Sequence, residues 1–432
     1  MKFLFAFVIA GLAVLGRAEP ASVSLESMLE LAQQRNPDIR AIRASVEALR
    51  SRPQSVRAWD NPVLGYSKED EPGGGEVTHW RGEQDIPFPG KRTSDGDTAV
   101  HEAEALEAEA LAKSLSVRAQ VRSLLFRLHR TQEMSRIFSE QIGIVDALTG
   151  SVGGRLSRVP GNAPMTGSPG SAGMGGAGTR DGGSAYFALE SERTRLVNAL
   201  LLEKQEYRSS AMELNALLDR PLKTPIEPFR LPAPALPKET VGQLYERALQ
   251  SGPTLLRSLQ EEQAAQARLK RARLSFAPDF SVMYDWMKDL EGMTGSEMRI
   301  SASVPLWWNR PRGERLEAQS ALLAAQHSAH AMGIELERTV TTAFEEVETR
   351  LTVLRNIETA LIPSARSAFN IERARFESGR GEVIVFLETF RGVLMGEMEY
   401  QRALEEFAAQ WGALEQGVGG AVALGRTKEN KK

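Results

Sequence analysis

The sequence predicts a mainly α-helical protein with a small β part, in which one order of elements occurs twice. Three observations predict this fold class: recurring prolines, two pairs of segments with alternating apolar residues, and long stretches with a helical apolar period. The prolines recur at offsets of 216, 216 and 218 positions: Pro37 and Pro253, Pro62 and Pro278, Pro87 and Pro305. Each copy therefore spans about half of the chain, in the order helix, strand, strand, helical hairpin.

The composition favours long helices over a thick globular core. The 432 residues are 42% hydrophobic, 25% charged and only 6% aromatic, which is typical of helices with a narrow apolar seam. A formal net charge of −3, with basic and acidic residues intermixed, argues against nucleic-acid binding. The chain has no cysteine, which excludes disulfides and a lipidated N-terminal cysteine.

The first residues have the pattern of a secretory signal peptide. Lys2 gives a positive start, residues 3–15 are apolar, and Ala18 supplies a small residue at the cleavage position. The apolar run is too short to span a bilayer. We therefore expect residues 1–18 to be a signal peptide that is removed after Ala18 when the protein is exported.

The boundaries of the two repeats follow from the proline pattern. We expect the first repeat over residues 19–220, a proline-rich linker over 221–238, the second repeat over 239–418 and a flexible tail over 419–432. The density of proline in the linker excludes a helix there. Each repeat opens with one expected helix and continues with two strands: helices 25–58 and 241–274, strands 63–68, 77–86, 280–288 and 297–306.

The strand candidates alternate between apolar and polar residues. Phe280, Val282 and Tyr284, for example, alternate with Ser281 and Asp285. A period of two with one apolar side indicates strands that lie between two different media.

After Pro305 the apolar period changes from two to about 3.6. The apolar residues advance in steps of three and four: Leu336, Val340, Ala343, Val347, Leu351, Leu354, Ile357 and Leu361. This is the seam of packed helices. Residues 313–377 thus predict a helix of about 95 Å, which Pro363 interrupts.

Four amphipathic strands per chain predict assembly in a membrane. An open sheet edge leaves unpaired N–H and C=O groups in lipid, so a lipid-exposed sheet must close into a barrel. Known spanning barrels begin near eight strands, so several copies of the chain must share one barrel, in a symmetric ring. Three copies would supply twelve strands.

The order and spacing of these elements resemble the TolC-type outer-membrane efflux proteins over essentially the whole mature chain. The motifs that carry the resemblance are LAQQRNP at 31–37, QDIPFPGKR at 84–92, VPLWWNRPRG at 304–313, ARF at 374–376 with Gly379, and FLE at 386–388. The segment 84–92 is most similar to the branch that serves heavy-metal exporters. The resemblance implies a homotrimer with a twelve-stranded transmembrane β-barrel that continues as a long periplasmic α-helical barrel.

The same resemblance implies a transport function without catalysis. The chain would be an outer-membrane channel subunit, a passive conduit docked to a periplasmic adaptor and an inner-membrane pump, with no enzymatic activity, cofactor or nucleic-acid partner. The sequence leaves the exported substrate open among metal ions, drugs and peptides. The alternatives are a periplasmic adaptor, which would normally carry one hairpin rather than two, and a structural coiled-coil protein of the envelope, which would not explain the strands or the duplication.

Proline and glycine residues at each strand exit are candidates for a swivel between the β and α parts. They stop strand pairing and allow the chain to turn. The candidates are Pro87, Pro89 and Gly90 in the first repeat, and Pro305, Pro311 and Gly313 in the second.

Acidic residues after the hairpin tips are candidates for a pore constriction. The resemblance places Glu388 at a position where family members narrow the tube, while a neighbouring family acid is replaced here by Val385. Glu190 is its counterpart in the first repeat. A ring of such carboxylates would favour cations, whereas the alternative is a solvated helix residue. Lesser candidates for gate or adaptor contacts are Arg380, Glu382 and Arg391.

The first hairpin tip carries an insertion of about 22 residues relative to the second. Residues 160–183 are rich in Gly, Ser, Pro, Ala and Met, a composition that predicts a flexible segment.

No metal site is expected. Thioether ligands suit Cu(I), and four methionines lie near the second strand pair: Met283, Met287, Met293 and Met298. Methionine is also an ordinary apolar filler, which is the favoured interpretation here.

Overall fold

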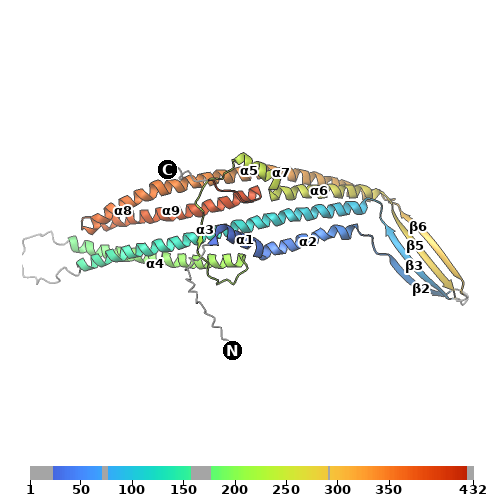
Figure 1. The fold of residues 1–432 in the computed structure, drawn as a ribbon, viewed down its shortest axis with the longest axis horizontal. Coiled ribbons are helices and arrows are strands. Elements are labelled where there is room, and N and C mark those ends of the chain that lie inside the picture. Colours follow the sequence, from blue (N-terminus) through green and yellow to red (C-terminus); the bar gives the residue numbers. More distant parts are fainter. Residues whose placement is uncertain (1–22, 71–75, 157–176, 290–291, 426–432) are drawn as a thin grey trace, which may run out of the picture.

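The protein is an elongated rod with a β-sheet at one end and helical hairpins at the other (Figure 1). The computed structural model describes residues 23–70, 76–156, 177–289 and 292–425. The expected signal peptide lies outside these ranges, as do residues 160–176 of the expected insertion. The described chain is mainly helical with a small β part in the expected order, which confirms the predicted fold class.

Each repeat opens with two helices rather than the single helix that was predicted. In the first repeat, α1 (Leu25–Arg35) and α2 (Pro37–Arg57) are separated by Asn36. The side chain of Asn36 accepts hydrogen bonds from the amides of Asp38 and Ile39, at 3.0 and 3.2 Å. A residue before proline avoids helical geometry, and Asn-Pro is a strong cap and first-turn pair. The second repeat has α5 (Val241–Ser251), α6 (Pro253–Arg273) and the short 3₁₀ turn η1 (Leu274–Phe276).

Four strands form one antiparallel sheet in the order β2-β3-β5-β6. They are β2 (Val63–Asp70), β3 (Glu76–Ile86), β5 (Asp279–Asp289) and β6 (Thr294–Ser303). The first three agree with prediction to within two residues, but the last begins and ends three residues earlier than expected. It ends before Pro305, which has no N–H for the ladder. The sheet therefore has two outer strands, β2 and β6, and each lacks a partner on one side among the described strands.

Long helices continue from the sheet to the far end of the rod. They are α3 (Lys91–Leu156), α4 (Ala177–Leu217), α7 (Asn309–Asn356), the π-helical turn η2 (Ile357–Leu361), α8 (Ile362–Glu377) and α9 (Val383–Val418). With 66 residues, α3 is about 100 Å long. The π turn lies directly before Pro363, at the expected interruption, because proline cannot supply the N–H that a regular turn requires.

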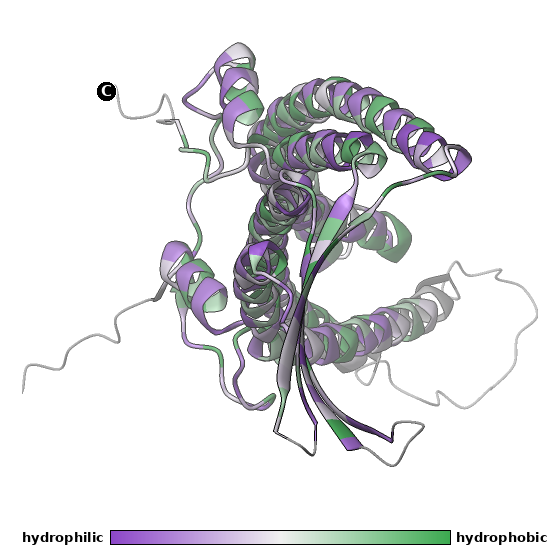
Figure 2. Cartoon of the chain, turned by 90° about the vertical axis from the view of Figure 1, so that its right-hand side faces the viewer, coloured by the Kyte–Doolittle hydropathy of each residue, from purple (hydrophilic) through white to green (hydrophobic). Residues whose placement is uncertain are grey.

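The helices lie side by side in one curved layer. Near the sheet, the contacts give the order α2-α3-α6-α7, and towards the tips they give α4-α3-α9-α8. Viewed along the rod, the layer follows an arc (Figure 2). The layer has two open edges, one formed by α2 and α4 and the other by α7 and α8.

A small outer layer covers the middle of the rod. Strands β1 (Val23–Ser24) and β4 (Phe229–Arg230) pair in parallel; α1 follows β1 directly, and the linker leads from β4 to α5. The linker is not helical, as expected. The expected flexible tail was wrong for its described part: Leu424 pairs with Pro237, and the amide of Gly425 donates to the carbonyl of Leu236 at 2.6 Å. These contacts fix residues 419–425 against the linker.

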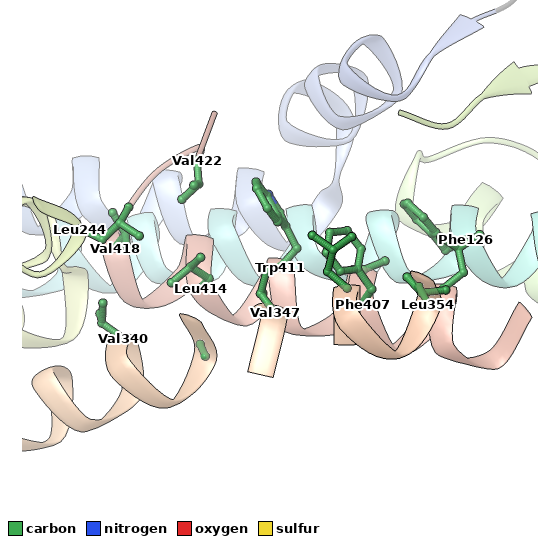
Figure 3. Packing of buried hydrophobic residues seen from close by; sticks show 14 of the residues in the cluster. Phe126, Leu244, Val340, Val347, Leu354, Phe407, Trp411, Leu414, Val418 and Val422 are labelled. Carbon is green, nitrogen blue, oxygen red and sulfur yellow. The ribbon is translucent and has the colours of Figure 1, made fainter. Parts of the chain in front are cut away.

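Buried apolar residues form three clusters along the rod. One lies at the middle, around α5, α7 and α9 (Figure 3). A second joins both hairpins near the tips, and a third packs α1 against α3 and α4. The apolar seam predicted from Leu336 to Leu361 is buried as far as Ile357, but its last residue, Leu361, is exposed.

Candidate functional site

The chain turns from sheet to helix through Gly90 and a buried lysine. Gly90 has φ +97°, and a Cβ there would lie 3.1 Å from Leu274 Cδ1. Lys91 Nζ contacts both carboxylate oxygens of Asp279, at 2.7 and 2.8 Å, and the amide of Phe88 donates to the same carboxylate at 2.8 Å. This clamp joins the start of α3 to the start of β5.

The second exit is built differently. Pro305 lies in the extended segment between β6 and α7. Pro311 and Gly313 lie inside α7, which begins at Asn309, and Gly313 has no positive φ. The prediction that these two residues form a swivel was therefore wrong, because the helix starts four residues earlier than the motif suggested.

Substitution of the two glycines is expected to have opposite effects on stability. Gly90→Ala is expected to lower it by about 1–2 kcal/mol, because an L-residue is strained at positive φ and its Cβ crowds Leu274. Gly313→Ala is expected to raise stability by up to about 1 kcal/mol, because alanine favours the helix and nothing lies within 4 Å of its Cβ. Thermal unfolding of both variants checks this, and equal shifts would contradict the assignment.

The sheet has one apolar and one polar face, as the alternation predicted. Cross-strand neighbours on the apolar face include Val282 with Ile300, and Tyr284 with Met298. On the opposite face, Arg81 lies beside Asp285 and Asp285 beside Glu297. The two faces of the sheet therefore differ in chemistry.

Asp285 is the centre of a charged cluster on the polar face. Its Oδ2 lies 2.9 Å from Nη2 of Arg81, and its Oδ1 lies 3.3 Å from Nδ1 of His79. Arg299 pairs with Glu297 at 2.7 Å on the same face. Charges paired in this way suit a wall that faces water rather than lipid.

Aromatic side chains gather at two levels of the sheet. Tyr66 and Trp80 have ring centroids 4.9 Å apart, and Trp80 lies opposite Trp286. Trp307 and Trp308 are exposed at the junction with the helices. Six residues separate Trp286 from Phe280 near the junction, about 20 Å of strand, which is close to the height of the apolar band in spanning barrels.

The four methionines do not converge on one point. Met283 and Met287 lie on the polar face, whereas Met298 pairs with Tyr284 on the apolar face. Met293 is in the exposed segment before β6. Strand alternation separates residues of odd spacing, so these thioethers do not form one metal-binding set. Across the described ranges, no three His, Asp or Glu side chains are grouped to hold a metal ion.

The tip of the second hairpin is a five-residue turn between α8 and α9. Gly379 has φ +77°, and the amides of Arg380 and Gly381 donate to the carbonyl of Arg375. Arg380 and Glu382 are exposed at this turn. Beneath it, the rings of Phe376 and Phe386 stack at 5.2 Å, which makes the tip a defined structure.

Glu388 and Glu190 occupy equivalent places on α9 and α4. Each follows a buried leucine, Leu387 and Leu189, of the cluster that joins the hairpins. Glu388 is exposed and Glu190 is half-buried. Successive helical residues point about 100° apart, so each carboxylate points away from the packed seam.

Arg391 connects the two hairpins. It pairs with Glu192 of α4 through Nη2 at 2.6 Å and Nε at 3.2 Å, while Glu192 is only 4% exposed. The hydrogen bonds that Arg391 donates to Glu192 raise the pKa of Arg391 against the effect of its partial burial, with a smaller contribution from Glu388. The guanidinium of Arg391 is therefore bound to Glu192 of the same chain, and it lies near Glu388, a candidate for the pore constriction.

The first repeat has a matching arginine at the same spacing. Arg193 follows Glu190 by three residues, as Arg391 follows Glu388, and pairs with Asp146 of α3 at 2.6 Å. The hydrogen bond to Asp146 raises the pKa of Arg193, and Glu190 adds to this. Sequence reasoning missed Glu192 and Asp146, although the repeated pattern Leu-Glu-x-x-Arg marks the arginines that hold them.

None of the described helices combines enough length with enough apolar residues to cross a lipid bilayer.

Comparison with known proteins gives one family and several similar folds. A family model described as outer membrane efflux protein matches residues 244–420. No curated protein matches the chain. A membrane protein from Pseudomonas aeruginosa has a similar structure, with a TM-score of 0.76, 17% identity and coverage of 93% of this chain and 92% of that one.

Two further outer-membrane proteins have the same fold. The outer membrane protein VceC from Vibrio cholerae gives a TM-score of 0.74 at 13% identity, over 92% of this chain and 96% of that one. The open state of the outer membrane channel MtrE from Neisseria gonorrhoeae gives 0.71 at 15% identity, over 92% and 89%.

Proposed function

We propose that three copies of the chain form a passive duct of a tripartite export system, since the outer membrane efflux protein model matches residues 244–420. In this proposal the protein is an outer-membrane efflux channel component and not an enzyme. In the proposal, substrate passes from an inner-membrane pump and a periplasmic adaptor through the helical tube, and leaves through the β-barrel.

One observation carries the proposal: the chain is an open strip along its whole length. The sheet ends in the outer strands β2 and β6, and the helical layer ends in α4 on one side and α8 on the other. Both helical edges expose apolar side chains. They include Phe187, Leu201 and Leu202 on α4, Leu316, Leu323 and Ile334 on α7, and Ile371 on α8.

Such a strip closes when copies join head to tail around one axis. The strands alternate in direction across the sheet, so β6 of one copy would run antiparallel to β2 of the next. Unequal edges that complement each other build a ring rather than a two-fold dimer. Closure removes the unpaired N–H and C=O groups that lipid does not tolerate, and three copies give twelve strands, within the known range.

The two aromatic levels support placing the sheet in the bilayer. Spanning barrels carry girdles of aromatic residues at both membrane interfaces. In the proposed orientation, Trp307 and Trp308 lie at the periplasmic interface, while Trp80 and Trp286 lie near the outer one. The polar face, with Asp285 and Arg81, then lines the lumen.

Pro87, Pro89, Gly90 and Pro305 are the proposed swivel residues. They occupy the short segments between the last strand residues and the first turns of α3 and α7. The clamp between Lys91 and Asp279 fixes the angle at which the tube leaves the barrel.

At the far end, Glu388 and Glu190 are proposed to form rings of carboxylates in the tube. Arg391 and Arg193, three residues further along the same faces, partly balance their charge. The rings would therefore favour cations weakly. The exposed Arg380 and Glu382 are proposed contacts for the adaptor. Arg391 is proposed as a gate residue rather than an adaptor contact, because its guanidinium already forms an ion pair with Glu192.

Current through planar bilayers tests the channel and the ring together. The purified protein is expected to give discrete conductance steps with a weak preference for K⁺ over Cl⁻. Glu388→Gln is expected to keep the steps and to lower the preference for K⁺, because each copy loses one charge. Glu399→Gln, at an exposed position of α9 further from the tip, is the matched control.

The outcomes separate the two parts of the proposal. Absence of current steps from well-folded trimers would contradict the duct. Steps with unchanged selectivity in Glu388→Gln would contradict the ring and leave the duct in place.

A further inference from the structure

A cavity of about 580 Å³ lies at the middle of the rod, where the two repeats meet. Its walls come from α1, α3 and α9, from residues 230–233 of the linker, and from residues 421–424 after α9. Ligand-binding cavities in proteins usually have volumes between about 300 and 1,000 Å³. The cavity is therefore large enough for a small organic molecule.

The inner wall of this cavity is apolar. Phe126, Phe407 and Trp411 line it and belong to the buried cluster of Figure 3. The ring centroids of Phe407 and Trp411 are 5.8 Å apart. Val422 and Leu424 extend the apolar surface along the C-terminal segment. An apolar group of a ligand would be removed from water here.

The carboxylate of Glu415 at this wall is already saturated with donors. Its Oε1 accepts from Nη2 of Arg122 at 3.1 Å, from Nε1 of Trp411 at 3.3 Å and from the amide of Val422 at 3.2 Å. Its Oε2 accepts from Nε of Arg118 at 3.3 Å. Glu415 is thus an internal structural anion and not a group that awaits a cationic ligand.

Arg122 is held at the wall of the cavity by its ion pair with Glu415. Its Nη1 lies 2.9 Å from Oε2 of Glu415 but is not aligned to donate a hydrogen bond, and it has no other partner among the described residues. Arg122 is only 6% exposed and lines the cavity. Nη1 itself is covered by protein atoms, so a ligand in the cavity cannot reach it, and Arg122 contributes positive charge to the wall rather than a hydrogen bond.

The charge of the lining also favours an anion. Arg118, Arg122 and Arg230 face Glu26 and Glu415. Arg118 bridges both carboxylates, whereas Arg230 has no ion pair in the described part of the chain. Three guanidinium groups against two carboxylates leave one positive charge, which a monoanion would balance.

We propose that this cavity binds a small amphipathic carboxylate, with its carboxylate at the guanidinium of Arg230 and its apolar body against Phe407 and Trp411. A charge-assisted hydrogen bond fixes the head, and burial of the body supplies the remaining affinity. The proposal does not depend on the channel function, because every lining residue belongs to the same chain and the site is outside the sheet and the hairpin tips.

Calorimetric titration of the detergent-solubilised protein tests the proposal. The probes are 1-naphthoate and 1-naphthalenemethanol, which share an aromatic body and differ in charge, and each is corrected with a titration into detergent alone. Naphthoate is expected to bind saturably at one site per chain, and the alcohol at least tenfold more weakly. Absence of saturable naphthoate binding, or equal binding of the alcohol, would overturn the proposal.

Variants of exposed lining residues locate the binding. Ala233→Trp fills the cavity and is expected to weaken naphthoate binding at least tenfold, whereas Ala233→Ser leaves the volume open and is expected to bind as the parent does. Arg230→Gln removes the surplus charge and is expected to weaken naphthoate binding several-fold without changing the alcohol. Both residues are exposed, so chromatography and thermal unfolding should match the parent. Undiminished binding by a folded Ala233→Trp variant would place the ligand elsewhere and contradict the assignment.

Discussion

Ile300→Arg is expected to prevent stable insertion of the proposed barrel, whereas Ser301→Arg, one residue later, is expected to be tolerated. Ile300 pairs with Val282 on the apolar face between the two aromatic levels, and Ser301 pairs with Ser281 on the polar face. Arginine on the lipid face near the midplane costs about 2–4 kcal/mol. Three copies in one barrel would therefore cost about 6–12 kcal/mol.

The measurement is the amount of heat-modifiable oligomer in outer-membrane fractions after electrophoresis without boiling. Ile300→Arg is expected to leave little or none, and Ser301→Arg to give nearly the parent amount. The two variants add the same side chain to the same strand, so the pair separates the face of the sheet from effects on expression. The reverse ranking would show that the face assigned to lipid lines the lumen.

Arg391→Ala is expected to loosen the contact between the hairpins and to leave the channel more open at rest. It leaves the buried Glu192 with only Arg195, whose Nη1 lies 3.6 Å away and whose side chain is exposed. Removing one partner of a buried ion pair typically costs 3–5 kcal/mol. We expect about 2–3 kcal/mol here, because the guanidinium of Arg391 is partly exposed and solvent screens it.

Conductance and thermal unfolding check this prediction. Arg391→Ala is expected to raise the mean conductance and lower the unfolding temperature. Replacing both partners, with Glu192→Leu and Arg391→Met, is expected to recover the unfolding temperature, since no buried charge is left unpaired. Arg366→Ala is the matched control, because the ion pair of Arg366 with Glu397 lies within the second hairpin and does not connect it to the first hairpin. Parent-like conductance in Arg391→Ala would exclude this residue from the gate.

The strands and their faces were predictable because they depend on local pattern. The alternation around Tyr284 reappears as two chemically distinct faces, and the three recurring prolines mark equivalent boundaries in both repeats. The single helix expected at the start of each repeat was wrong, although a local signal marks each break. Asn36-Pro37 and Gly252-Pro253 each combine a cap with a first-turn proline, and each divides what was expected to be one helix.

The ion-pair partners at the candidate gate were not predictable. Glu388 and Arg391 were singled out from one stretch of sequence, but Glu192 lies 199 positions from Arg391. Which of several acidic residues on α4 faces α9 depends on the relative rotation of two packed helices. A rotation of one residue, about 100°, would replace Glu192 by a neighbour.

The sequence by itself determined the duplication, the nature of each element and the two-sided character of the sheet, because periodicity and proline act over a few neighbouring residues. Only the tertiary structure decided the neighbours of each helix, the two open edges, the partner of Arg391 and the cavity beside Arg122. These depend on contacts between residues far apart in the chain, and their geometry is set by packing rather than by local pattern.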